Sequence, residues 1–137
     1  MKISLVPVEH TPFAWNEVRH YLEPAIERSD GRWTMEHLCA AVLMGSTQLW
    51  VAFDDQRSWG CVTTEITSYP AKKVLSMHFL GGEQFGSWYN LMLEQLTAYA
   101  IDMGCESIEG VARFGFWKFL KADGFKKSSA FYEKKLR

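Results

Sequence analysis

Residues 73–112 read KVLSMHFLGG EQFGSWYNLM LEQLTAYAID MGCESIEGVA, and they combine three kinds of local pattern. The β-branched and apolar residues of Lys73–Leu80 predict a strand. A glycine-bearing loop follows, and the apolar spacing from Ser87 to Met103 predicts a long helix that is capped by Ser87 and ended by Gly104. Ser107–Ala112 then predicts another strand. A strand, a helix and a strand in this order form a crossover, so these two strands are expected to run parallel.

The residues before this unit predict hairpins. Thr47–Phe53 and Trp59–Ser68 are rich in apolar, aromatic and β-branched residues, and a short polar turn separates them. A second short turn, at residues 68–71, leads into the Lys73–Leu80 strand. Connections this short join antiparallel neighbours, so we expect a three-stranded antiparallel meander.

The N-terminal third predicts one edge strand and two helices. Lys2–Val8 alternates weakly and contains a proline, which is typical of an edge strand. Thr11 is expected to cap the first helix, and Pro24 to kink or restart it. Thr34 is expected to cap the second helix, with Gly45 as its stop.

The C-terminal quarter predicts a short helix over Arg113–Ala122, stopped by Gly124, and a final strand over Ala130–Leu136. The full order is β-α-α-β-β-β-α-β-α-β. This order predicts an α/β fold with a mixed, mostly antiparallel sheet flanked by helices. Because no linker or repeat interrupts the pattern, residues 1–137 are expected to form one domain.

Composition excludes several classes of protein. The 137 residues carry a net charge of −1 and are 47% hydrophobic, which is typical of a globular chain. No apolar run is long enough for a bilayer, and residues 1–4 contain no apolar core of a signal peptide. Cys39, Cys61 and Cys105 are odd in number and widely spaced, so we expect neither disulfides nor zinc, and a cytoplasmic location.

Charge is distributed unevenly along the chain. Residues 113–137 contain eight basic and two acidic side chains, a balance of +6, and the remainder balances at −7. A basic segment with aromatic residues can bind nucleic acid by stacking. We expect most of these rings in the core instead, so nucleic-acid binding is not favoured.

The element order resembles the GNAT (N-acetyltransferase) fold over essentially the whole chain. Scattered residues further resemble GNAT-like proteins encoded by tailed phages and prophages. These residues are Leu49-Trp50-Val51, Tyr69-Pro70, Lys73-Val74-Leu75, Leu80-Gly81-Gly82, Trp88, Ala100, Gly104-Cys105, Ile108-Glu109, Arg113, Trp117, Leu120 and Gly124-Phe125.

The GNAT resemblance implies an acetyl-CoA site. In the family the fourth strand splays from the fifth and the acyl arm lies in the gap, while the pyrophosphate binds backbone N–H groups at the N-terminus of the long helix. The helix dipole favours an anion there. On this chain the resemblance implies a site formed by Phe79, Leu80, Gly81, Gly82, Gly86, Ser87 and Arg113.

Two departures from the family pattern bear on activity. The family loop usually reads Gln/Arg-x-x-Gly-x-Gly/Ala, but here Glu83 and Trp88 occupy the outer positions and only Gly86 matches. A carboxylate about 4 Å from a phosphate costs about 4 kcal/mol at an effective dielectric near 20, so Glu83 would have to point away. The tyrosine that many members use as general acid is Leu120 here, with Tyr99 and Tyr132 as conceivable substitutes.

Candidate bases lie in the predicted strands. Glu65 and His78 could each take the acceptor amine's proton through water, although each is also explained as an ordinary strand residue. Glu109 has the same two interpretations. No histidine pair has the spacing of helix-borne metal ligands, so no metal is expected.

Two functions therefore follow from the sequence. The first is a phage-type GNAT-fold protein with a degenerate acetyl-CoA site, weakly active or non-catalytic, that serves as a virion or assembly component and binds phage proteins or itself. The second is an acetyl-CoA-dependent N-acetyltransferase acting on an unidentified amine. Trp88 and Trp117 fall where an active site is expected to hold small or polar residues, which favours the first.

Overall fold

The structure is a computed structural model that describes residues 1–137. One mixed sheet forms its centre, with the strand order β1-β2-β3-β4-β5. The strands are β1 (Lys2–Leu5), β2 (Gln48–Phe53), β3 (Ser58–Tyr69), β4 (Lys72–Gly82) and β5 (Ser107–Gly110). The pairs from β1 to β4 are antiparallel and β4–β5 is parallel, as the sequence predicts.

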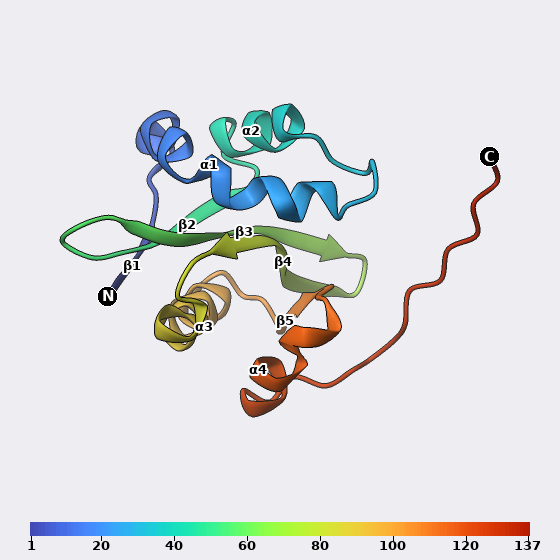
Figure 1. Cartoon of the computed structure of the whole chain (residues 1–137). Coiled ribbons are helices and arrows are strands. Elements are labelled where there is room, and N and C mark those ends of the chain that lie inside the picture. The colour runs from blue at the N-terminus through green and yellow to red at the C-terminus, as the bar shows by residue number, and fades with distance from the viewer.

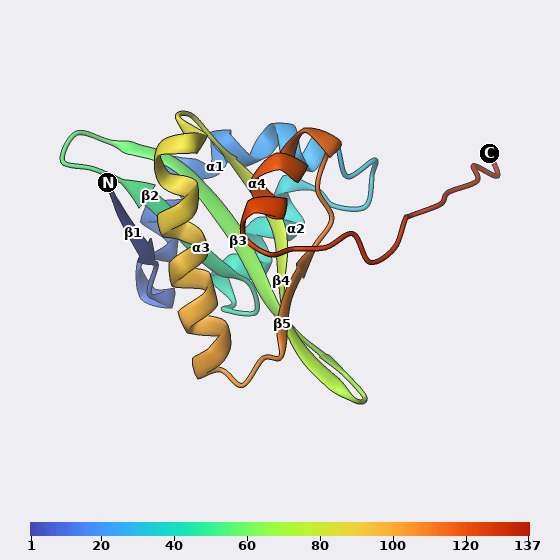
Figure 2. The ribbon, with the colours of Figure 1, turned by 90° about the horizontal axis from the view of Figure 1, so that it is seen from below.

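Helices cover both faces of the sheet (Figures 1 and 2). Helices α1 (Thr11–Glu27) and α2 (Met35–Leu43) lie on one face, after a 3-10 turn, η1 (Val8–His10). Helix α3 (Phe85–Asp102) lies across the other face, with η2 (Phe114–Phe116) and α4 (Trp117–Ala122) beside it. None of these helices has the length and apolar character that crossing a membrane requires.

Two cores fill the spaces between these layers, because successive residues of a strand point to opposite faces. Leu49 and Val51 of β2 pack with α1 and α2. Trp50 and Ala52, the alternate residues, pack with Trp88 and other residues of α3. The sheet is therefore buried on both faces over β2 and β3.

The structure corrects the expected cap of α1 and excludes the restart that Pro24 allowed. Thr11 is the first helical residue rather than the cap, and its hydroxyl donates to the Val8 carbonyl at 2.7 Å. The helix continues through Pro24 without a restart. A proline forfeits one backbone hydrogen bond, but Leu22 and Ile26 on either side are buried in the core, and this packing holds the last turn. The expected Thr34 cap is confirmed, since its hydroxyl accepts from the His37 N–H.

The beginning of α3 also differs from the expectation. The cap position is Gln84, in a left-handed conformation with φ 54°, and Ser87 lies inside the helix. The Ser87 hydroxyl donates to the Gln84 carbonyl at 2.6 Å instead of accepting from the helix. The cap therefore lies three residues before the expected serine, directly after Glu83, whose N–H is still bonded to Trp59 of β3.

The predicted strand over Ala130–Leu136 is absent. Residues 125–137 contain no helix or strand and extend away from the body (Figures 1 and 2). Phe131, Tyr132 and Leu136 are 71%, 88% and 85% exposed. A strand forms only with a partner, and β5 has just four residues, so the local pattern alone did not produce one. We call residues 125–137 the tail.

Candidate functional site

The pairing of β4 with β5 stops in the middle of β4. The last paired residues are Met77 and Gly110, and β4 continues from His78 to Gly82 with no neighbour on that side. Beyond Gly110 the chain turns away, and Val111 is almost fully exposed. This geometry leaves an open edge between two diverging strands, where the resemblance implies the acyl arm.

A β-bulge lies at the start of this open edge. Thr63 pairs with Phe79 and Thr64 pairs with Met77, so His78 is the extra residue. The Thr63 hydroxyl accepts the Phe79 N–H at 3.1 Å and replaces a ladder bond. A bulge redirects side chains, and bulges are common beside active sites.

The bulge brings the two predicted bases together. His78 Nε2 lies 3.6 Å from Glu65 Oε2, and both side chains keep access to solvent. His78 Nδ1 is buried without a partner. Trp33 belongs to the loop between α1 and α2. Its ring centre lies 5.8 Å from that of the His78 imidazole, so it covers one side of the Glu65–His78 pair. Trp33 carries no sequence motif that would have identified it.

A polar network lies next to this pair and spans three strands. Ser76 of β4 lies directly between Glu65 of β3 and Glu109 of β5 in the sheet register. The Tyr69 hydroxyl donates to Glu109 Oε1 at 2.6 Å, and this hydrogen bond raises the pKa of Tyr69. Thr67 and Ser76 hydroxyls are 2.8 Å apart. These side chains offer donors and acceptors to a polar molecule on the α1 face of the sheet.

The N-terminus of α3 lies at the far end of the open edge of β4. The first N–H groups of a helix have no intrahelical partner, and here only that of Ser87 is used, by the Gln84 carbonyl. A Cβ added at Gly86 would contact nothing within 4 Å, so this turn borders open space. An anion at this place would meet free N–H groups and the positive end of the helix dipole.

Glu83, the acidic residue of this loop, forms an ion pair. Glu83 Oε2 accepts from Arg57 in the turn between β2 and β3, at 2.7 Å. Arg57 also donates to the Tyr21 hydroxyl, which contributes most to raising the arginine pKa, and its guanidinium lies 4.5 Å from the Trp59 ring centre. The Glu83 charge is therefore offset by a fixed cation. Sequence spacing gave no sign of Arg57, which is 26 residues away.

The two glycines before this loop serve packing. A Cβ on Gly81 would lie 1.8 Å from the Tyr21 carbonyl oxygen, so the absence of a side chain lets α1 approach the sheet. Gly82 has a φ of +145°, a backbone conformation that residues with a side chain rarely adopt, and it faces the β3 backbone at Gly60. They shape the turn toward α3 and are enclosed by protein.

The other predicted cofactor residues are spread around the open edge. Phe79 packs on the α1 core and Leu80 on the α3 core, so only their backbones face the edge together. Arg113 is exposed, with its guanidinium 5.4 Å from the Phe116 ring centre. Phe116 in turn packs against Phe85, the first residue of α3, which places the arginine near that helix end.

Trp88 does not obstruct the site. It is fully buried in the α3 core, and its indole N–H donates to the Glu83 carbonyl at 2.8 Å. Tyr99 packs on Trp50 under the sheet, and Tyr132 projects from the tail, so neither replaces the missing general acid at this edge. Tyr89 packs between Phe85 and Phe119, and burial raises its pKa to about 12.

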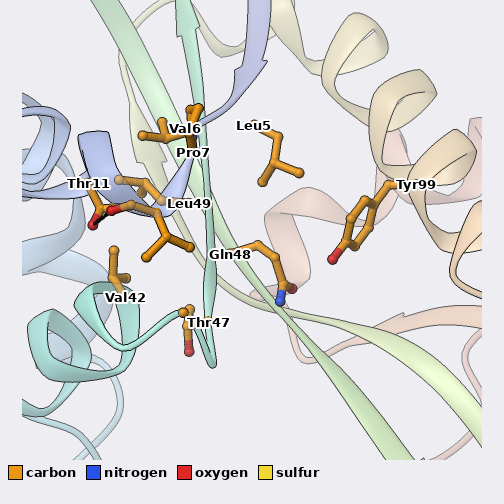
Figure 3. Close-up of a pocket in the computed structure, with 11 residues that line it drawn as sticks. Leu5, Val6, Pro7, Thr11, Val42, Thr47, Gln48, Leu49 and Tyr99 are labelled. Atoms are coloured by element: carbon orange, nitrogen blue, oxygen red, sulfur yellow. Dashed lines mark hydrogen bonds between the residues drawn. The ribbon is translucent and has the colours of Figure 1, made fainter.

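A separate cavity of about 400 Å³ lies at the other end of the sheet, where β1 leaves β2 (Figure 3). Tyr99 and Gln48 point toward each other across it, with Leu5 above. Tyr99, the conceivable general acid, lines it, but none of the predicted bases and cofactor-binding residues does. No three His, Cys, Asp or Glu side chains are grouped to hold a metal ion.

The protein resembles known proteins in its structure and not in its sequence. No protein-family model and no curated protein matches the sequence. An aminoglycoside acetyltransferase from an uncultured soil metagenomic sample, solved with sisomicin, has 13% identity and a TM-score of 0.74, and the match covers 99% of this chain and 96% of that one.

Two further solved structures show the same similarity. A predicted acetyltransferase from Clostridium acetobutylicum, solved with acetyl-CoA, has 11% identity and a TM-score of 0.71 over 98% of this chain and 96% of that one. A ribosomal-protein-alanine N-acetyltransferase from Brucella melitensis has 10% identity and a TM-score of 0.71 over 99% of this chain and 100% of that one. This chain therefore has the fold of the GNAT acetyltransferases.

Proposed function

We propose that the protein is an acetyl-CoA-dependent N-acetyltransferase that acts on an amine. The observation that carries this proposal is the Glu65–His78 pair, which the β-bulge holds at the point where β4 and β5 part. Similar folds solved with acetyl-CoA and with sisomicin agree with such an activity.

The residues present fit acetyl-CoA. Its pyrophosphate would be held by the free N–H groups around Gly86 in the first turn of α3, with Arg113 nearby, and its arm by the open backbone edge from His78 to Gly82. Glu83 does not oppose this, because Arg57 offsets its charge. When bound, acetyl-CoA supplies an activated acetyl group on a thiol leaving group.

Glu65 and His78 act as the general base that removes a proton from the acceptor amine. An amine is nucleophilic only after it loses a proton, and imidazole and carboxylate can both accept one through water. Trp33 covers one side of His78, and Ser76 and Glu109 offer polar contacts that orient the acceptor. The thiolate leaving group accepts a proton from water.

Binding of acetyl-CoA is tested by titration calorimetry on three variants. We expect micromolar affinity for the natural chain, which Glu83→Ala retains and Gly86→Trp loses, because the indole would fill the space beside the first turn of α3. Gly86→Ala is the matched control and should bind normally. Absence of binding at millimolar acetyl-CoA would reject the enzymatic function and leave the non-catalytic phage-type role, as a virion or assembly component, as the remaining proposal.

Catalysis is tested by release of free CoA thiol in the presence of a panel of amines: a polyamine, an aminoglycoside, free lysine and a peptide with a free N-terminus. Glu65→Gln and His78→Ala should each lower kcat by about 10² to 10⁴, the usual contribution of a general base, with unchanged acetyl-CoA affinity. Glu94→Gln, an exposed residue of α3, is the control. Equal rates in all three variants would show that the pair is not the base.

A further inference from the structure

The aromatic side chains of residues 113–137 do not lie in the core, so the sequence expectation for them is wrong. None of these rings is buried, and they are Phe114, Phe116, Trp117, Phe119, Phe125, Phe131 and Tyr132. η2 and α4 form the outermost layer on the α3 side (Figure 1), so no further layer covers the outward faces of their rings. Burial in the core was the reason against nucleic-acid binding, and that reason no longer holds.

Positive charge is concentrated at the same place. Residues 113–127 contain five basic side chains and one acidic side chain, and all five basic side chains are exposed. Residues 1–112 balance at −7, so the molecule separates its charges. A surface of this kind attracts a polyanion. We call it the basic patch, and it consists of Arg113, Phe114, Phe116, Trp117, Lys118, Phe119, Lys121, Lys126 and Lys127.

Three cations of the basic patch lie beside its rings. The pairs are Lys127–Trp117, Lys118–Phe119 and Arg113–Phe116, with distances from the cation to the ring centre of 4.8, 5.1 and 5.4 Å. Lys127 of the tail therefore lies against the first residue of α4. Lys118 and Lys121 share one face of α4, because they are three residues apart. These contacts gather the positive charges into one surface.

Phe114 is the ring of the basic patch that is most open to solvent. It is 92% exposed and begins η2, directly after Arg113. Proteins bind single-stranded nucleic acid by stacking bases on exposed rings while neighbouring cations contact the phosphates. Phe114 and the lysines of α4 provide both kinds of contact.

We propose that the basic patch binds single-stranded nucleic acid, with a base stacked on Phe114 and the phosphates held by lysines of α4 and the tail. A single strand fits better than an anionic membrane. Helix α4 has only six residues, and the rest of the body, at −7, would be repelled by an extended anionic surface. A narrow strand can contact the basic patch alone. This inference does not depend on catalytic activity.

Fluorescence anisotropy with a labelled oligothymidylate of about 16 nucleotides tests the binding. The logarithm of the association constant should fall linearly with the logarithm of the salt concentration, by about 0.7 for each phosphate contact. Lys121→Gln should make this slope shallower by about 0.7. Arg19→Gln, which removes an exposed cation of α1, is the matched control and should leave the slope unchanged. Absence of binding at about 50 mM salt would overturn the proposal.

Phe114→Ala tests the stacking of a base. The affinity for oligothymidylate should fall by about 5- to 150-fold, the usual contribution of one stacked base. Phe13→Ala removes a ring of α1 that is 71% exposed, so it is the matched control and should bind as the natural chain does. Neither change should lower the Tm, because both rings are exposed. Equal affinity of Phe114→Ala and the natural chain would reject a stacked base and with it the proposal.

Heparin and vesicles of phosphatidylserine distinguish other anionic partners. Heparin carries dense negative charge and no bases, so Phe114→Ala should leave its affinity unchanged. An equal loss of affinity for heparin and for oligothymidylate would show that this substitution does not act through stacking, which contradicts the proposal. Binding of the vesicles without binding of oligothymidylate would make the basic patch a membrane-binding surface and overturn the proposal.

Discussion

At the scale of single residues, two buried threonine hydroxyls differ in their hydrogen-bond partners. The Thr64 hydroxyl accepts the Trp50 indole N–H at 3.0 Å and donates to Gln48 at 2.9 Å, all within the sheet. The Thr47 hydroxyl, at 3% exposure, has no partner. Both groups are threonine hydroxyls, so the difference in hydrogen-bond partners should decide how removal of each one changes the free energy of unfolding.

Replacement of both threonines by valine tests this directly. Thr47→Val removes an unsatisfied hydroxyl and should raise the free energy of unfolding by about 1 kcal/mol. Thr64→Val leaves the Trp50 N–H without an acceptor and should lower it by about 1–3 kcal/mol. Urea denaturation measures both values. Equal effects of the two changes would contradict the assignment of the Thr64 hydrogen bonds.

Tyr89 predicts a dependence of stability on alkaline pH. Its pKa is raised to about 12 from an ordinary value near 10, first by burial and then by Asp123. Below pH 10 the phenol is protonated in folded and unfolded chains, so this effect is constant. Between pH 10 and 12 only the unfolded chain releases the proton, so the free energy of unfolding should fall by about 2 kcal/mol.

Tyr89→Phe should abolish that part of the fall, and denaturation at a series of alkaline pH values measures it. The variant should also be slightly more stable at neutral pH, because the Tyr89 hydroxyl has no hydrogen-bond partner. Tyr132→Phe, on an exposed ring of the tail, is the control and should leave the pH profile unchanged. An unchanged profile in Tyr89→Phe would show that its hydroxyl is not buried as described.

At the scale of elements, the contact between α1 and β4 depends on a missing side chain. Gly81→Ala would place a methyl group 1.8 Å from the backbone of Tyr21, so α1 must move away from the sheet. We expect a loss of at least about 3 kcal/mol, because backbone cannot yield as a flexible side chain does. Thermal unfolding measures this change.

Gly86→Ala is the matched substitution, in the first turn of α3 with open space around it. Alanine is the better helix former, so this variant should gain about 0.5–1 kcal/mol. Gly86 has an ordinary helical backbone, since it is not among the glycines with positive φ. A destabilised Gly86→Ala would mean that this turn is more crowded than the structure indicates.

At the scale of the whole molecule, the tail contributes little to the folding of one chain. Arg32→Ala removes both the ion pair with Glu133 and the contact with Phe131. Both contacts are exposed, so we expect a change of about 1 kcal/mol or less in the free energy of unfolding. Denaturation together with limited trypsin digestion checks this: cleavage in the tail should become faster while the body stays intact. A loss of several kcal/mol would make the tail part of the cooperative unit.

Local sequence determined much of this protein. Helix stops at Gly45, Gly104 and Gly124 are confirmed by their positive φ values, since glycine adopts that conformation without strain. Short polar turns required antiparallel neighbours, and one long crossover required a parallel pair. These signals act within a few residues, and for this reason the order of the elements from β1 to α4 could be predicted.

Tertiary structure alone decided the site and the fate of the last segment. His78 meets Glu65 only because a bulge shifts the register between β3 and β4, and Arg57 meets Glu83 only because two turns lie side by side. The strand pattern of Ala130–Leu136 found no partner within its own chain. Register, packing and pairing depend on groups far apart in the sequence, and their free energies outweigh the local preference of any one segment.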